Sequence, residues 1–177
     1  MKFSKKLVAC IAVMMMACMM LTACGTSPTV NNVVKAEDGQ ADGVIGTTFR
    51  TVFFDYSVDS VAYPTEYEGY TPTDGMQLLD VVITIKNTFG EDLPMYNSDF
   101  QLQWHDLGDG DDDYDFGIDM SSSSTVMPAE YTLAKGESCT YHIIYEAPAE
   151  AKEFSVSFLE FFADNTEGDV FFTSFSK

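Results

Sequence analysis

Basic side chains are scarce in this chain of 177 residues, in which Lys and Arg number 9 against 28 Asp and Glu. Lys2, Lys5 and Lys6 precede an apolar run that resembles a cleaved leader. Without them, six basic side chains stand against 28 acidic ones, a net charge of −22. Such a surface repels nucleic-acid phosphates and anionic lipid headgroups. We therefore exclude nucleic acid as a partner.

The motifs of common enzyme classes are also missing. The chain has two histidines, His105 and His142, and neither belongs to an HExxH pair or to another metal-ligand spacing. The sequence contains no GxSxG elbow, no glycine-rich phosphate loop and no CxxC pair. We predict no catalytic residue and a protein that is not an enzyme; a hydrolase is the least favoured alternative.

Cysteine is too sparse for a disulfide framework. Cys10 and Cys18 lie in the leader and Cys24 directly follows it, which leaves Cys139 as the remaining one of the four cysteines. A processed chain with one free thiol forms no internal disulfide, so its core must stabilise it. Cys139 is expected to be a small buried hydrophobic residue rather than a reactive thiol.

One long apolar run is present, from Leu7 to Leu21, behind the three lysines. This layout is typical of a secretory signal. The run is slightly short for a membrane-spanning helix of about 20 residues, and a permanent anchor is the alternative.

The residues that follow the run, LTACG at 21–25, resemble the lipobox of bacterial lipoproteins. The resemblance implies cleavage between Ala23 and Cys24 and a diacylglyceryl group on the Cys24 sulfur. Several acyl chains would then hold the protein on the outer face of the cytoplasmic membrane. The predicted organisation is a signal peptide at 1–23, a lipidated N-terminus with a flexible tether at 24–43, and one domain at 44–177.

The domain shows alternating apolar and polar residues rather than helical spacing. The clearest case is Leu79, Val81, Ile83 and Ile85, which alternate with Asp80, Thr84 and Lys86. Similar alternation recurs around Phe54, Phe100, Ile143 and Phe154 and in 169–175. Seven to nine short strands in about 130 residues predict an all-β fold, an immunoglobulin-like β-sandwich. A closed barrel is the structural alternative.

Several stretches resemble Gram-positive lipoproteins that carry an immunoglobulin-like domain of unknown function, related in shape to secreted immunoprotective extracellular antigens. The most specific stretches are the strand that ends in Lys86-Asn87-Thr88 and the turn Lys135-Gly136-Glu137-Ser138, whose following strand closes at Ala147-Pro148. The resemblance spans most of 46–176 and implies fold and extracytoplasmic placement. It supplies no catalytic residues, and the cysteine pair of antibody domains is absent.

An aspartate-rich stretch, HDLGDGDDDYDFGID at 105–119, is a candidate calcium site. Asp109, Asp111, Asp113 and Asp115 provide the oxygen ligands that Ca²⁺ prefers. Neither EF-hand register of the stretch has glycine at position six or glutamate at position twelve. The simpler interpretation is a solvated polar connection between strands, and no other cofactor is expected.

A tyrosine-rich loop, AYPTEYEGYTPTDG at 62–75, is a candidate ligand-binding surface. Tyr63, Tyr67 and Tyr70 could stack on a sugar or grip a peptide. The alternative is that they fold back and cover the open end of the core. Together these observations predict a lipid-anchored, non-enzymatic binding module for an unknown envelope protein, peptide or polymer. A calcium-binding surface protein is the alternative.

Overall fold

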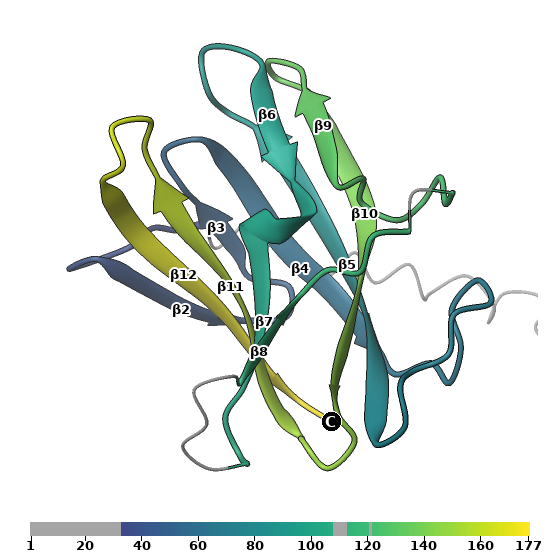
Figure 1. The fold of residues 1–177 in the computed structure, drawn as a ribbon. Helices are drawn as coiled ribbons and strands as arrows, with labels where there is room; N and C mark the ends of the chain where they lie inside the picture. Colours follow the sequence, from purple (N-terminus) through teal and green to yellow (C-terminus); the bar gives the residue numbers. More distant parts are fainter. Residues whose placement is uncertain (1–32, 108–112, 121) are drawn as a thin grey trace, which may run out of the picture. The chain divides into compact units, whose positions relative to one another are not determined.

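The computed structural model describes residues 33–107, 113–120 and 122–177. Within these ranges the chain forms strands β1 to β12 and one short 3₁₀ helix, η1 (Asn97–Asp99). Two five-stranded sheets enclose a common core, and a two-stranded sheet stands beside them (Figure 1). This confirms the all-β sandwich, and because the two large sheets are separate, the fold is not a closed barrel.

The first sheet has strand order β1-β3-β4-β5-β10. Its longest pairing is antiparallel and runs from Ser138 opposite Lys86 to Pro148 opposite Met76. The residues predicted to face inward, Leu79, Val81, Ile83 and Ile85, are all fully buried. Its strands are β1 (Val33–Val34), β3 (Thr48–Arg50), β4 (Phe54–Ala62), β5 (Met76–Asn87) and β10 (Ser138–Pro148).

The second sheet has strand order β2-β12-β11-β7-β8. Strand β11 occupies its centre and is bulged between Leu159 and Phe161. A bulge locally bends and twists a strand, and this one lies near the turn that leads to β12. The strands are β2 (Gln40–Val44), β12 (Glu167–Ser176), β11 (Glu153–Phe161), β7 (Phe100–Trp104) and β8 (Tyr114–Phe116).

The folded domain begins earlier in the chain than the sequence indicated. Val33 and Val34 pair with β3 in the first sheet, and residues 40–44 pair in parallel with β12 in the second. The boundary predicted at residue 44 is therefore wrong, and 33–43 do not belong to a tether. The sequence QADGV of β2 is small and polar, so it lacks the apolar alternation that identifies a strand.

The described residues also contain more strands than the seven to nine predicted, because seven of these strands are only two to five residues long. Two of these, β6 (Leu93–Tyr96) and β9 (Glu130–Leu133), form the third sheet. In the part of the chain that is described, no helix is long and apolar enough to cross a membrane.

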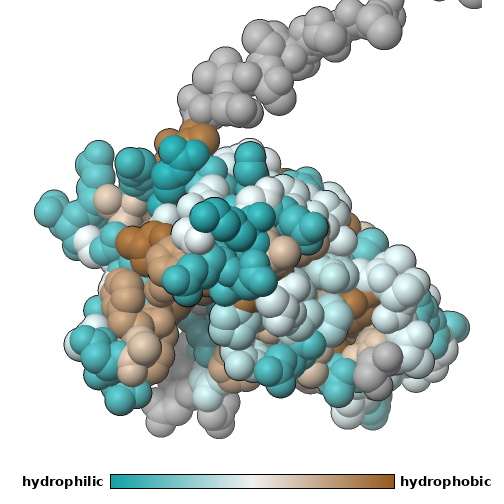
Figure 2. All heavy atoms as spheres, turned by 90° about the horizontal axis from the view of Figure 1, so that it is seen from above, coloured by the Kyte–Doolittle hydropathy of each residue, from teal (hydrophilic) through white to brown (hydrophobic). Residues whose placement is uncertain are grey.

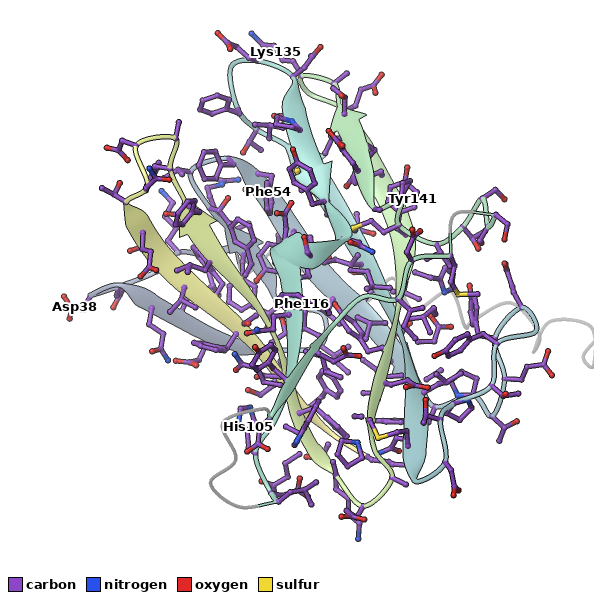
Figure 3. The ribbon with its side chains drawn as sticks, viewed as in Figure 1. Asp38, Phe54, His105, Phe116, Lys135 and Tyr141 are labelled. Carbon is purple, nitrogen blue, oxygen red and sulfur yellow. The ribbon has the colours of Figure 1, made fainter. Side chains whose placement is uncertain are left out.

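Aromatic rings fill the space between the two large sheets. Phe54 lies in the interior in Figure 3, and its ring centroid is 4.7 Å from that of Phe158 on the opposite sheet. Phe100, Tyr56 and Phe171 extend the same cluster, with centroids 5.4 to 6.5 Å apart. Such tilted and edge-to-face pairs add about 0.5–1.5 kcal/mol each beyond the area that they bury. This core explains how the domain dispenses with a disulfide.

The outer edge of β10 is covered by the chain that follows β8. The backbone N–H of Ile118 donates to Ile144 (2.7 Å), and that of Met127 donates to His142 (2.8 Å). The His142 N–H in turn donates to Thr125 (2.9 Å). A covered edge cannot pair with another chain. Ligand binding by strand addition is therefore disfavoured at β10.

Candidate binding cleft

A cleft of about 620 Å³ opens at one end of the sandwich. Its walls come from β6 with η1 and from the end of β11 with the turn to β12; these two regions stand at the same end of the domain in Figure 1. Figure 2 looks onto this end and shows the surface hollowed between two lobes, with hydrophobic residues beside the hollow. The volume falls within the range of small-molecule binding pockets, about 300–1,000 Å³.

The β6 wall presents both buried and exposed residues to the cleft. Leu93 and Met95 are buried and join the core, whereas Pro94 and Tyr96 point outward. All four line the cleft. The alternation of a strand thus gives this wall an apolar base and an accessible rim.

The β11 wall owes its shape to the bulge. Leu159 and Phe161 remain 40% and 56% exposed, while Glu160 between them is buried. The Glu160 carboxylate accepts hydrogen bonds from the backbone N–H of Val52 (2.8 Å) and of Asp169 (3.2 Å). These bonds hold two segments against β11: the start of β12 and the turn that precedes β4. Two large apolar side chains are held at the surface as a result.

The base of the cleft is aromatic. Phe53 lines it from the turn before β4, Phe54 from the start of β4 and Phe158 from β11. The ring of Phe53 lies 5.6 Å from that of Phe162 and 5.9 Å from that of Phe89. This belt of rings offers flat apolar surfaces to a ligand.

Of the described residues that line the cleft, Asp99 is the single one with a carboxylate, and none has a basic side chain. Its Oδ2 accepts a hydrogen bond from the backbone N–H of Tyr96 (2.8 Å). Burial raises the pKa of Asp99 from its usual 3.8 to about 6, and the hydrogen bond from Tyr96 opposes this rise. At neutral pH the cleft therefore carries a carboxylate that protein and water solvate poorly.

The three candidate tyrosines pack onto the domain. Tyr63 lies under the Lys177 ammonium, 5.0 Å from its ring centroid, and its hydroxyl is buried. The Tyr70 hydroxyl donates to Glu146 (3.2 Å), and the Tyr67 ring lies 5.9 Å from that of His142. Tyr67 and Tyr70 also cover a small apolar cluster formed by Leu78, Val126 and Ile144. This placement favours the covering role, and ligand binding by these tyrosines stays a prediction.

The aspartate stretch is described only in part, since Asp109 and Asp111 lie outside the described residues. Asp115 turns inward from β8 and accepts a hydrogen bond from the backbone N–H of Glu146 (3.0 Å). Burial raises the pKa of Asp115. The carboxylate of Asp115 thus ties β8 to β10. Among 33–107, 113–120 and 122–177 no group of three or more His, Cys, Asp or Glu is placed to hold a metal ion. Calcium binding that includes Asp113 stays a prediction.

The two histidines each contact a neighbouring polar side chain, and Cys139 is partly buried. The Nδ1 of His142 lies 2.7 Å from Asp80, and the Nε2 of His105 lies 2.9 Å from the Ser155 hydroxyl. Cys139 is half-buried, and burial raises the pKa of its thiol. A thiol with a raised pKa is a weak nucleophile at neutral pH. Ala23 and Cys24, the predicted cleavage and lipidation site, lie outside the described residues.

Sequence reasoning missed the cleft, although one signal was present. In FLEFFA at 158–163 the alternation of β11 breaks, and three apolar residues follow Glu160. A break of this kind at the end of a strand indicates a bulge. Asp99 could not be singled out from the sequence, because carboxylates are common throughout so acidic a chain.

Comparison with known proteins supports the fold and leaves the family open. No family model matches the chain, and no curated protein matches it significantly. Among solved structures, Bacillus subtilis ycdA, described as a "putative lipoprotein", has a TM-score of 0.55 at 16% identity; the match covers 73% of this chain but only 38% of that longer one. B. subtilis yjhA has a TM-score of 0.51 at 18% identity over 66% of this chain and 81% of that one. A Clostridium difficile "uncharacterized beta-sandwich protein" has a TM-score of 0.45 at 14% identity, over 81% of this chain and 99% of that one. The chain thus shares its fold with the two Bacillus subtilis proteins.

Proposed function

We propose that this protein is a lipid-anchored, extracytoplasmic binding module of a Gram-positive cell, and that the cleft beside β6 and β11 is its ligand site. The cleft is the observation that carries the proposal. It is bordered by exposed apolar side chains, which a soluble domain otherwise buries or scatters. The lipobox resemblance at residues 21–25 and the likeness of the fold to a "putative lipoprotein" support the placement.

The ligand that fits this geometry is a peptide segment with large apolar side chains. A pocket between two sheet walls accepts side chains, while the exposed rim of Tyr96, Leu159 and Phe161 can cover the adjoining backbone. Because the cleft is already formed, the protein would lose little conformational entropy when a peptide binds. A protein or processed peptide of the cell envelope meets these requirements.

Titration calorimetry of the mature, unacylated chain against capped apolar hexapeptides tests the proposal. Ala163 lines the cleft and is exposed, so Ala163→Trp should fill the cleft without disturbing the core. Val44 on β2 is 62% exposed and outside the lining, so Val44→Trp is the matched control. We expect saturable binding that the first variant weakens at least tenfold and the control preserves. Equal binding by both variants would move the site elsewhere, and no binding by any apolar peptide would refute the proposal.

A further inference from the structure

A second property of the cleft is its charge, and the inference drawn from it rests on the proposed function. The geometry points to a cationic ligand: we infer that the cleft selects a peptide segment in which a Lys or Arg lies among apolar side chains, with Asp99 as the partner of the positive charge.

The first reason is the position of Asp99. Its carboxylate stands at the end of η1, within the lining and opposite the apolar β11 wall. A side chain that enters between the walls would bring its end group to this carboxylate while its methylenes contact Leu93 and Met95. Lys and Arg carry such an apolar stem with a charged tip.

The second reason is that, among the residues that the structure describes, no Lys, Arg or His forms an ion pair with Asp99. It accepts one hydrogen bond, from the Tyr96 backbone. By contrast, Asp55 on β4 forms an ion pair and receives two hydrogen bonds from Arg50, at 2.8 and 2.7 Å. A half-buried carboxylate with one donor gains most from a ligand that supplies a charged one.

The other charged or titratable groups around the cleft do not compete for this role. The phenols of Tyr96 on β6 and Tyr131 on β9 bring no positive charge, and burial further raises the pKa of Tyr131. On β11, the Glu160 carboxylate is already held by two backbone N–H groups. Glu130 on β9 is exposed and pairs with Tyr96 through the backbone. A cation at the cleft therefore meets Asp99 and an acidic surround.

The long-range field favours the same ligand. The whole chain carries a net charge of −19, so a basic peptide is drawn toward it, whereas an acidic one is repelled. This attraction is screened over about 8 Å at physiological salt. Distant charges therefore contribute less to selectivity at that salt than a direct contact with Asp99 does.

The experiment compares three capped hexapeptides, Gly-Leu-Phe-Lys-Phe-Gly and the same sequence with Gln or Glu in place of Lys, at pH 7.5 and 150 mM salt. We expect the Lys peptide to bind at least tenfold more tightly than the Gln peptide and the Glu peptide to bind most weakly. Asp99→Asn should reduce the Lys-to-Gln ratio to nearly one, because its side-chain oxygen keeps the Tyr96 hydrogen bond but loses the charge. Glu91→Gln removes one exposed charge outside the lining and should keep the ratio.

The outcomes separate this inference from the proposed function. If the Gln peptide binds as tightly as the Lys peptide, and Ala163→Trp weakens both, the cleft is a ligand site without charge selection and the inference is wrong. If Glu91→Gln removes the preference as fully as Asp99→Asn, the preference comes from the overall field, which also overturns it. Concentration-dependent dimerisation that Ala163→Trp abolishes would identify a second copy of the chain as the occupant and would contradict a peptide ligand.

Discussion

Asp99→Asn should stabilise this protein at neutral pH and leave its stability unchanged in acid. In the folded chain burial raises the pKa of Asp99 from 3.8 to about 6. The native state therefore holds this proton more tightly than the unfolded chain does. The stability that the protonated carboxyl contributes is fully present below pH 3.8, and it is lost as the pH rises through about 6.

The magnitude follows from that shift. Two pKa units correspond to about 3 kcal/mol at 1.36 kcal/mol per unit, and we reduce this to about 2 kcal/mol because Asp99 keeps partial contact with water. Asparagine resembles the protonated acid in shape and cannot ionise. The variant should therefore unfold with a free energy about 2 kcal/mol larger than the parent at pH 7.5, and with an equal one at pH 3.5.

Urea unfolding followed by fluorescence at several pH values from 3.5 to 7.5 measures the difference. For a domain of this size, 2 kcal/mol corresponds to a rise in Tm of about 6 °C. Glu91→Gln is the control, because it removes an exposed carboxylate and should shift stability by less than about 0.5 kcal/mol at every pH. A difference between parent and Asp99→Asn that does not vary with pH would refute the reasoning, since it could not come from titration of Asp99.

Four further changes probe the rest of the molecule. Thr173→Val should stabilise the domain by about 1 kcal/mol in thermal melts, because its hydroxyl is fully buried and accepts or donates no hydrogen bond within the described structure. Gly43→Ala should cost about 2 kcal/mol or more, since a Cβ at this position would lie 2.7 Å from a neighbouring phenylalanine ring; an unchanged Cm in urea would contradict this. Tyr67→Ala with Tyr70→Ala should cost about 2–4 kcal/mol if these rings cover core, whereas near-native stability with lost ligand binding would restore their binding role. Cys24→Ser should leave an uncleaved precursor that takes up no labelled fatty acid; normal processing of the variant would rule out the lipoprotein assignment.

The parts of the fold that the sequence predicted are those in which burial alone sets the pattern. Strand β5 is an interior strand, paired with β4 and β10, and its inward residues from Leu79 to Ile85 must be apolar at every second position. Strand β2 lies at an edge and is held by backbone pairing with β12. Because backbone hydrogen bonds need no particular side chain, such a strand leaves little trace in composition.

The candidate sites show a different limit. Tyr63, Tyr67 and Tyr70 drew attention because they are close in sequence, yet each contacts a different distant partner, Lys177, His142 or Glu146. The cleft instead joins residues near 53, 95 and 160, which no local pattern connects. Proximity of this kind depends on how the sheets pack. It follows from the three-dimensional structure alone.

The cleft remains open because a buried, hydrogen-bonded carboxylate holds its β11 wall in place. The Glu160 carboxylate is buried and accepts hydrogen bonds from two separate segments, at Val52 and Asp169. Gly168 allows this approach, since a Cβ there would lie 2.7 Å from the Glu160 oxygen and 2.8 Å from the Phe162 ring. A movement of β11 that broke these bonds would leave the buried carboxylate without their two N–H donors, a cost of about 3 kcal/mol or more. The exposed apolar wall is therefore maintained by a buried polar contact, which also keeps the cleft open.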